Sequence, residues 1–406
     1  MNEKNFLRNK EKIYRMLINI YENPFYKKRM LNETMVSFNQ FDYQYFSKNI
    51  PVIEKKDLLG VEETLLPSQI SQSKLFFDDT SGTDGEPLRC YMGEKEKILF
   101  SKKLWSIRKS IVPNLNINDK VVQFYSSRHI KGKTITDAVV DSEKQLLLSL
   151  FDLSEPKLKL FIETISNTGC QWLHAVPSAV LALARVINRY ALRIPELKYI
   201  ELTGEYISEE EFKYIKETFK TTVINHYGLR EFWTIGYGEG NMLEINEDNV
   251  FIENDTLSSE NTGILVTSLS NSMWPLIRYR VKDNVKLVEK NDEFKLKIMG
   301  GRHSEYIELC GTSYNSIVFS YVVREINRRM KGTSIIKYQI HKLNSNEILF
   351  IVVLEQEKQK SLVEKHLKNI GNEVLPSICI EMKVQSEIEL SFESGKKRTV
   401  IDKTID

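Results

Sequence analysis

The feature that most constrains the fold is an alternation of short apolar runs with helical patterns between residue 75 and about residue 290. Apolar runs of strand length occupy residues 121–124, 199–202 and 222–225. Helical patterns occupy residues 156–168, 177–190 and 208–219. Because strands that alternate with helices tend to pair in parallel, this order predicts an α/β fold. We expect a large N-terminal domain with mixed, mostly parallel sheets and flanking helices.

The C-terminal part of the chain follows a different order. Strand patterns occupy residues 306–309 and 378–384, a hairpin pattern joins 334–342 to 347–355, and helical patterns occupy 316–330 and 358–370. This βαββαβ-like order predicts a small α+β domain. Gly300 and Gly301 mark the junction, so the predicted domains are residues 1–302 and 303–406.

The charge balance limits the classes of partner. Lys and Arg number 57 against 55 Asp and Glu, a formal charge of +2, which argues against a nucleic-acid scaffold or a polybasic membrane binder. The longest apolar run, residues 348–354, has seven residues, whereas a membrane span needs about 20. The N-terminus lacks the apolar segment of a signal peptide, and the four cysteines are too dispersed for a zinc cluster or a disulfide framework. We expect a cytoplasmic protein.

The sharpest local signal is the segment 79–87, which combines hydroxyl side chains with glycines. Its members are Asp79, Thr80, Ser81, Gly82, Thr83, Asp84, Gly85, Glu86 and Pro87. Glycines let backbone N–H groups approach an anion and hydroxyls add donors, so the segment suits phosphate binding. Taken alone, an ordinary surface turn of this composition is the simpler interpretation.

Two further segments place polar groups where predicted strands end. Residues 225–233 run from an apolar strand into a glycine turn with Tyr227, Gly228 and Glu231, where a ring can stack on a base and a carboxylate can hold Mg²⁺. Residues 274–283 alternate apolar and basic residues and end at Asp283, an acceptor for ribose hydroxyls. For residues 225–233 the alternative is a capped turn whose aromatic residues belong to the core. For residues 274–283 the alternative is a plain strand with solvated charges.

Two glycine-containing segments lie further along the chain. Residues 300–305 contain Arg302 and Glu305 at the predicted junction, and residues 394–400 contain Lys396 and Lys397. Taken alone, residues 300–305 are more simply interpreted as a linker turn, and residues 394–400 as a solvated basic tail. The order and spacing of all these segments carry more information than any one of them.

In this order and spacing the segments resemble those of the adenylate-forming enzymes, the superfamily of acyl-CoA synthetases, peptide-synthetase adenylation domains and luciferases. The chain looks most like the phenylacetate–CoA ligase branch, which includes capsule-biosynthesis adenylating proteins. The segments similar to that branch are residues 23–26 (NPFY), 50–58 (IPVIEKKDL), 176–178 (VPS) and 202–205 (LTGE). The resemblance extends from about residue 23 to residue 402.

The resemblance implies an AMP-forming acid–thiol ligase with a small, mobile C-terminal domain. A carboxylate would attack the α-phosphate of ATP, with Mg²⁺, to give an acyl-adenylate and pyrophosphate. A thiol, from coenzyme A or the phosphopantetheine of a carrier protein, would then take the acyl group and release AMP. Because two anions must meet in the first step, catalysis would rest on charge neutralisation and positioning.

The resemblance also implies roles for individual residues. Lys396 would be the catalytic lysine, with Lys397 as the adjacent alternative, and Glu231 would bind Mg²⁺. Glu305 would be the hinge, and Gly311 would lie on the face presented for the second step. The residues expected to bind ATP or AMP are Thr80, Ser81, Gly82, Thr83, Gly85, Gly204, Glu205, Tyr227, Gly228, Asp283 and Arg302.

The phosphate loop departs from the family pattern at two positions. Asp84 stands where threonine is frequent, and Glu86 stands where lysine is usual. Two carboxylates beside a triphosphate would repel it unless Glu86 points outward. A degenerate, nucleotide-binding regulatory module is therefore an alternative to an enzyme.

The resemblance places the acyl pocket among residues that include several aromatic side chains. Tyr125, His174, Phe232 and Trp233 would line it, which suits a flat aromatic acid such as a phenylacetate or hydroxybenzoate. An amino acid is less favoured because no acidic residue is an obvious partner for its amine. A capsule-type adenylating protein acting on a non-aryl acid is a further alternative.

The thiol acceptor stays open between coenzyme A and an aryl-carrier protein of siderophore or other secondary-metabolite assembly. A carrier protein would need a basic docking patch, and candidates are Arg324, Arg328, Arg329 and Lys331. A solvated helix end explains these residues equally well. A homodimer is expected from the resemblance only, and neither nucleic acid nor a membrane is an expected partner.

Overall fold

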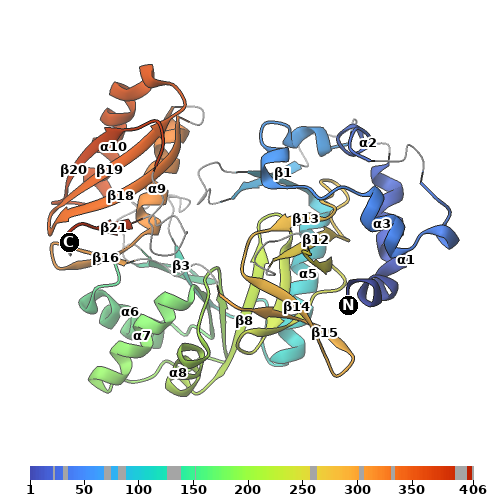
Figure 1. Ribbon diagram of the computed structural model, residues 1–406. Helices are drawn as coiled ribbons and strands as arrows, with labels where there is room; N and C mark the ends of the chain where they lie inside the picture. The colour runs from blue at the N-terminus through green and yellow to red at the C-terminus, as the bar shows by residue number, and fades with distance from the viewer. Residues whose placement is uncertain are drawn as a thin grey trace.

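The computed structural model describes residues 1–404 except for residues 22, 31–34, 68–74, 81–87, 126–138, 151, 257–262, 301–305, 331–333 and 389–399. A large N-terminal part surrounds a mixed sheet, and the C-terminal residues form a separate, smaller unit (Figure 1). An antiparallel bridge between Asp152 and Tyr314 joins the two parts. The predicted fold class, α/β with a small α+β domain, is confirmed.

A ten-stranded sheet forms the centre of the large part. Its strands, in spatial order, are β14 (Val285–Lys290), β15 (Glu293–Ile298), β10 (Met242–Ile245), β9 (Trp233–Gly238), β8 (Thr222–Leu229), β7 (Tyr199–Thr203), β6 (Trp172–Ala175), β3 (Val121–Tyr125), β5 (Gln145–Ser149) and β4 (Val139–Asp141). Parallel pairing joins only β5, β3, β6, β7 and β8, and antiparallel strands complete both edges. The sheet is therefore mixed, with its parallel strands in the middle.

Helices cover both faces of the parallel strands. Leu173 and Ile200 pack in one core cluster with α6 (Glu155–Asn167), α7 (Pro177–Tyr190) and α8 (Glu209–Phe219). The preceding residues, Trp172 and Tyr199, point to the other face and pack with α5 (Glu94–Ile111). This alternation gives each strand two buried faces, as parallel strands between helix layers require.

Two helices on the sheet, α7 and α8, begin where the sequence predicts. Pro177 occupies the first turn of α7, where its missing N–H leaves no bond unmade, and the helix ends at Ala191 in a left-handed conformation. Ser208 and Glu211 form a capping box at the start of α8, which confirms the predicted cap.

The N-terminal helices and two small sheets pack against the side of the large sheet that carries β14 and β15 (Figure 1). A three-stranded antiparallel sheet contains β11 (Val250–Asn254), β12 (Ile264–Ser268) and β13 (Tyr279–Val281), and a hairpin contains β1 (Leu75–Asp79) and β2 (Arg89–Gly93). The helices are α1 (Asn2–Ile20), α2 (Pro24–Lys27), α3 (Tyr43–Asn49) and α4 (Lys55–Leu58), with 3₁₀ turns at Phe38–Gln40 and Glu62–Leu65.

The small C-terminal part has its own hydrophobic core, built from residues between Ile307 and Val400. Its elements are β16 (Tyr306–Leu309), β17 (Thr312–Asn315), α9 (Ile317–Arg329), β18 (Ile335–Asn344), β19 (Glu347–Leu354), a 3₁₀ turn (Glu357–Gln359), α10 (Lys360–Val374), β20 (Cys379–Val384) and β21 (Val400–Asp402). The predicted βαββαβ sandwich needs one correction. β16 pairs with β17 in a separate hairpin, and β21 completes the sheet of β20, β19, β18 and β21. Residues 301–305 lie outside the described residues, so the boundary at 302 stays a prediction.

Two predicted strands also differ from the structure. β8 continues past residue 225 to Leu229, so Tyr227 and Gly228 lie in a strand rather than in a turn after it. The charges at 278 and 280 are not solvated, because Arg278 and Arg280 form ion pairs inside the structure. Among the described residues, no helix has both the length and the apolar character needed to cross a membrane.

Arg278 ties the N-terminal segment to the sheet that leads to Asp283. Its Nε donates to Glu253 at 3.1 Å, and its Nη1 donates to the carbonyl oxygens of Ser47 and Ile50, each at 2.7 Å. The Glu253 side chain is fully buried. The ion pair therefore links three segments that are far apart in the sequence.

Arg278→Met should lower the free energy of unfolding by about 3 kcal/mol, because it leaves the Glu253 carboxylate buried without its partner. The measurement is urea unfolding followed by circular dichroism. Arg193→Met is the matched control, since Arg193 pairs with Glu196 on the surface, where both side chains are mostly exposed, and its effect should stay below about 1 kcal/mol. Equal effects of the two substitutions would contradict this account.

Candidate active site

The carboxyl ends of β6, β7 and β8 lie side by side, which is where open α/β sheets bind ligands. Gly204 follows β7 in a left-handed conformation, with φ of 85°. The Glu205 carboxylate next to it accepts a hydrogen bond of 3.0 Å from the backbone N–H of Ser178, in the first turn of α7. Both predicted nucleotide-site residues therefore lie at the junction of β7 with a helix start.

Tyr227 and Asp283, which are far apart in the sequence, are in direct contact. The Tyr227 hydroxyl on β8 donates to Asp283 Oδ2 at 2.8 Å. The pairing of β8 with β9 shifts register at Tyr227 and Gly228, and a Cβ at residue 228 would lie 2.3 Å from the Trp233 carbonyl oxygen. Only glycine fits there, and it brings the Tyr227 ring beside the end of β13.

Glu231 lies in the turn between β8 and β9, close to Tyr227 and Asp283. Its Oε1 accepts a hydrogen bond of 3.1 Å from the Tyr279 hydroxyl. Burial raises the pKa of Glu231 above its ordinary value; its own backbone N–H, Tyr279 and the charge of Lys55 oppose that rise, and Asp283 adds to it. A carboxylate with little water around it gains most from a cation, so Glu231 is suited to hold Mg²⁺.

Thr80 closes the segment predicted to bind phosphate. Its backbone N–H donates to the Leu88 carbonyl oxygen at 2.9 Å, and its hydroxyl oxygen accepts from the Leu88 N–H at 2.9 Å. These two bonds extend the β1–β2 hairpin by one pair. The residues between them, Ser81, Gly82, Thr83, Asp84, Gly85 and Glu86, lie outside the described residues.

The remaining predicted site residues divide into two groups. Arg302, Glu305, Lys396 and Lys397 lie outside the described residues, so their roles stay predictions. Of the predicted acyl-pocket residues, Phe232 is 2% exposed and packs against Tyr279 in the core. Trp233 stacks on Phe100 of α5. Tyr125 is the last residue of β3, and its side chain lies outside the described part of the structure, so its role stays a prediction.

His174 belongs to a buried polar cluster that the sequence analysis missed. At its centre the Arg108 guanidinium of α5 donates to both carboxylate oxygens of Glu201 on β7, each at 2.7 Å. The hydroxyls of Tyr199 and Tyr237 also contact Glu201 Oε2. The one available signal was a glutamate in an otherwise apolar strand run, since a buried carboxylate requires a partner.

Two histidines extend this cluster across neighbouring strands. His226 Nδ1 of β8 lies 3.1 Å from Glu201 Oε1, and its Nε2 lies 3.0 Å from the Thr234 hydroxyl. His174 Nδ1 of β6 lies 3.2 Å from Gln123 Nε2, while its buried Nε2 has no hydrogen-bond partner. Burial lowers the pKa of His174 to about 4, so its imidazole is neutral near pH 7. Hydrogen bonds from Arg108 and His226 hold the pKa of Glu201 well below its usual range although burial opposes this.

The atoms that His174, Glu201 and His226 offer lie within 4.8 Å of one another, the spacing of a metal site. Arg108 decides against a cation there, because its guanidinium already neutralises the carboxylate. A divalent ion would leave two further positive charges uncompensated in a buried site. The cluster is therefore a hydrogen-bond network centred on the Arg108–Glu201 ion pair rather than a metal centre.

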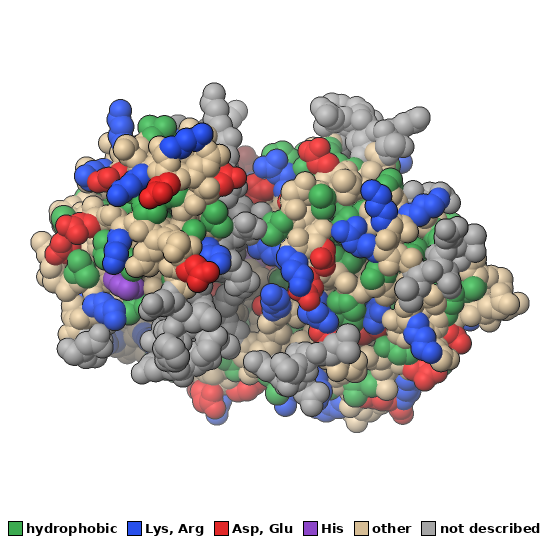
Figure 2. Space-filling view, turned by 45° about the horizontal axis from the view of Figure 1, so that its top comes forward, with side chains coloured by type: hydrophobic (Ala, Val, Ile, Leu, Met, Phe, Trp, Pro, Cys, Tyr) green, Lys and Arg blue, Asp and Glu red, His purple; other side chains and the backbone are tan. Residues whose placement is uncertain are grey.

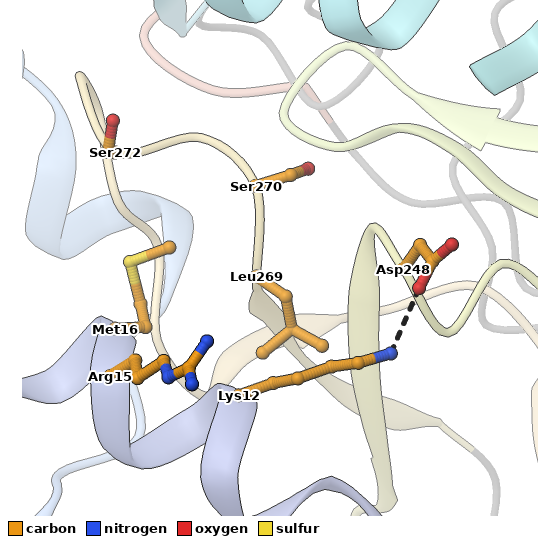
Figure 3. Close-up of a pocket in the computed structure, with 7 residues that line it drawn as sticks. All are labelled: Lys12, Arg15, Met16, Asp248, Leu269, Ser270 and Ser272. Atoms are coloured by element: carbon orange, nitrogen blue, oxygen red, sulfur yellow. Dashed lines mark hydrogen bonds and ion pairs between the residues drawn. The ribbon is translucent and has the colours of Figure 1, made fainter.

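The large part also contains a hollow of about 330 Å³ (Figure 3). It is lined by Lys12, Arg15, Met16, Asp248, Leu269, Ser270 and Ser272. Lys12 points across the hollow to Asp248, 3.0 Å away. None of its lining residues belongs to the predicted nucleotide site.

Comparisons with known proteins identify the fold. No family model and no curated protein matches the sequence. Among solved structures, a 2-hydroxyisobutyryl-CoA ligase with 2-HIB-AMP and CoA in the thioesterification state is 16% identical, with a TM-score of 0.56 over 97% of this chain and 89% of that chain. The open conformation of that ligase, with the same two ligands, is 15% identical and has a TM-score of 0.54. The match covers 97% of this chain and 90% of that chain. The chain therefore has the fold of an adenylate-forming acyl-CoA ligase, as the sequence motifs predicted.

His174 makes stability dependent on pH. Its pKa is about 4 in the folded chain and about 6.5 in the unfolded chain. Between these values the unfolded chain binds more protons, so stability falls as pH falls from 6.5 towards 4. From pH 7 to pH 5 this residue should remove about 2 kcal/mol of the free energy of unfolding.

His174→Gln should remove this pH-dependent part of the unfolding free energy. The difference in unfolding free energy between wild type and variant should therefore change by about 2 kcal/mol between pH 7 and pH 5. Urea unfolding at pH 7, 6 and 5 measures it. Other groups titrate in both proteins and cancel in the difference. Parallel pH profiles of the two proteins would exclude a buried, neutral His174.

Proposed function

We propose that this chain is an AMP-forming acid–thiol ligase. The observation that carries the proposal is the contact of the Tyr227 hydroxyl with Asp283, with Glu231 in the adjacent turn, at the strand ends of a ligase fold. An aromatic ring, a ribose acceptor and a half-buried carboxylate are the groups that suit a nucleotide with its metal. Three separate sequence segments contribute them.

In the proposed first step the carboxylate of the acid attacks the α-phosphorus of ATP. A new O–P bond forms, and the bond from that phosphorus to the oxygen bridging to the β-phosphorus breaks. The bridging oxygen leaves with the electron pair as part of pyrophosphate. Tyr227 stacks on adenine, Asp283 accepts from the ribose hydroxyls, and Gly204 and Glu205 border the base.

Charge neutralisation would come from the cation and from the small domain. Glu231 would hold Mg²⁺, which reduces the negative charge of the phosphates when bound. Lys396 would contact the α-phosphate and the attacking carboxylate, with Lys397 as the adjacent alternative. In the second step the thiolate attacks the acyl carbon, and AMP leaves with one oxygen of the original carboxylate.

The class of acid has two candidates. A flat aromatic acid, such as a phenylacetate or hydroxybenzoate, remains the prediction of the sequence. The rings of Phe232 and Trp233 pack against Tyr279 and Phe100, which weakens their part in that prediction. A non-aryl acid, as for a capsule-type adenylating protein, is the second candidate, and the packing of these two rings inside the protein is the observation that favours it.

Coenzyme A is the proposed thiol acceptor, and a carrier protein is the alternative. Two of the four residues in the basic patch that a carrier protein would need, Arg328 and Arg329, both pair with Glu325 on α9, which reduces the charge of that patch. The 2-hydroxyisobutyryl-CoA ligase that shares this fold binds CoA. The cytoplasmic location and the homodimer stay predictions.

Acid-dependent ATP–pyrophosphate exchange tests the proposed function. The panel contains benzoates, phenylacetates, small hydroxy acids, amino acids and fatty acids. One acid should support exchange, and Lys396→Ala should lower the rate about 100-fold or more, because a charge aimed at the transition state is lost. Lys397→Ala is the comparison variant, and a loss in Lys397→Ala instead of Lys396→Ala would identify Lys397 as the catalytic lysine. ATP binding without exchange for any acid would favour a regulatory nucleotide-binding module.

Tyr227→Phe keeps the aromatic ring but removes the hydroxyl that holds Asp283. We expect the KM for ATP to rise about fivefold and the preference for ATP over dATP to fall, because Asp283 is less well oriented for the ribose. Steady-state kinetics with both nucleotides measure this. Tyr91→Phe is the control, since Tyr91 donates to the Glu63 carboxylate outside the site, at 3.2 Å. An unchanged ATP to dATP ratio in Tyr227→Phe would remove Asp283 from ribose binding.

A further inference from the structure

The phosphate segment of this chain lacks an expected positive charge. Thr80 and Leu88 close a hairpin whose connecting residues include Asp84 and Glu86 but no lysine or arginine. Under the proposed function, this hairpin faces a nucleotide triphosphate and then a departing pyrophosphate. Their charge must be neutralised by cationic groups from elsewhere in the chain.

Arg230 lies beside the base of this hairpin. It directly precedes Glu231 in the turn between β8 and β9, and its guanidinium pairs with the Asp78 carboxylate on β1. Asp78 is two residues before Thr80. The Arg230 side chain remains 63% exposed, so it can exchange this carboxylate for another anion without leaving a buried charge behind.

Arg324 approaches the same place from the small domain. Its helix, α9, faces β1 in the arrangement of the two parts (Figure 1). Loss of surrounding water lowers the pKa of Arg324, Tyr338 opposes the change, Arg230 lowers it further and Asp78 raises it. Arg324 still has a large accessible surface although neighbouring groups displace part of its water, and no described carboxylate forms an ion pair with it. Arg324 is therefore close enough to Arg230 and Asp78 for their charges to act on it, and Asp78, which pairs with Arg230, does not balance both positive charges.

The surface agrees with this excess. Lys and Arg side chains gather along the side of the large part that faces the small part (Figure 2). The neighbouring ion pair of the same hairpin, between Arg89 and Asp79, is separate from this cluster. Successive residues of a strand point to opposite faces, so Asp79 directs its partner away from the side of Asp78.

We infer that Arg230 and Arg324 form a divided anion site for the β- and γ-phosphates of ATP and for pyrophosphate, replacing the positive charge that Glu86 removes from the loop. Arginine suits this task because its planar group donates two parallel hydrogen bonds to phosphate oxygens. When the bond to the α-phosphorus breaks, the electron pair moves onto pyrophosphate, and both guanidinium groups stabilise it. Because they come from different domains, the site is complete only in a domain arrangement that holds α9 near β1.

Equilibrium binding of pyrophosphate, ATP and AMP to the full chain tests this inference, which rests on the proposed function. Arg230→Gln and Arg324→Gln should each weaken pyrophosphate and ATP binding about tenfold, through the loss of a charge-assisted contact. AMP affinity should change less than about twofold in both variants. Arg89→Gln is the matched control, an arginine paired with aspartate on the same hairpin, and it should bind all three ligands like the wild type.

A second variant asks whether the arginines replace the missing loop charge. Glu86→Lys in the Arg230→Gln background should recover most of the pyrophosphate affinity. Unchanged pyrophosphate affinity in both arginine variants, an equal loss for AMP, or no recovery with Glu86→Lys would overturn the inference. In the first two cases, acid-dependent exchange by the wild type would leave the proposed function intact. A wild type that binds no ATP would overturn both.

Discussion

The buried ion pair between Arg108 and Glu201 is the interaction on which the candidate site depends. It joins α5 to the central strand β7, and Tyr199, Tyr237 and His226 complete the contacts of the carboxylate. Such a pair adds little net stability, yet losing one partner leaves an uncompensated charge and is strongly destabilising. It therefore fixes one arrangement of α5 on the sheet. The strand ends that lead to Gly204 and Tyr227 take their positions from that arrangement.

The proposed chemistry adds a second electrostatic constraint, since a carboxylate must approach a triphosphate. Three groups of described residues meet this constraint. Glu231 is half-buried and suited to hold a cation, and the Tyr227–Asp283 pair is suited to the nucleoside. Exposed arginines lie beside the β1–β2 hairpin. Glu231, Tyr227 and Asp283 come from segments of the large part. The proposed arginine site also includes Arg324 of the small domain, so neutralisation of the departing pyrophosphate would depend on the arrangement of the two parts.

Local signals predicted most of the fold. Pro177 and the Ser208–Glu211 capping box fixed helix starts because those residues act on neighbouring backbone groups. β17 escaped prediction because Thr312–Asn315 has little apolar character, and the end of β8 was misread because Gly228 suggests a turn until its pairing with β9 is known. Tyr227, Asp283 and Glu231 were identified from a resemblance in motif order. The contact of Arg108 with Glu201 joins residues 93 positions apart, and no local pattern contains it.

The central claim is that the acid is activated as an acyl-adenylate, and the fate of its oxygen tests this most directly. The acid that supports pyrophosphate exchange is prepared with ¹⁸O in both carboxylate positions and incubated with ATP, Mg²⁺ and coenzyme A. Mass spectrometry of the products should find one ¹⁸O atom in AMP and none in pyrophosphate, because the attacking oxygen stays on the α-phosphorus when the thiol takes the acyl group. Label in inorganic phosphate together with ADP, or AMP without label, would contradict the account.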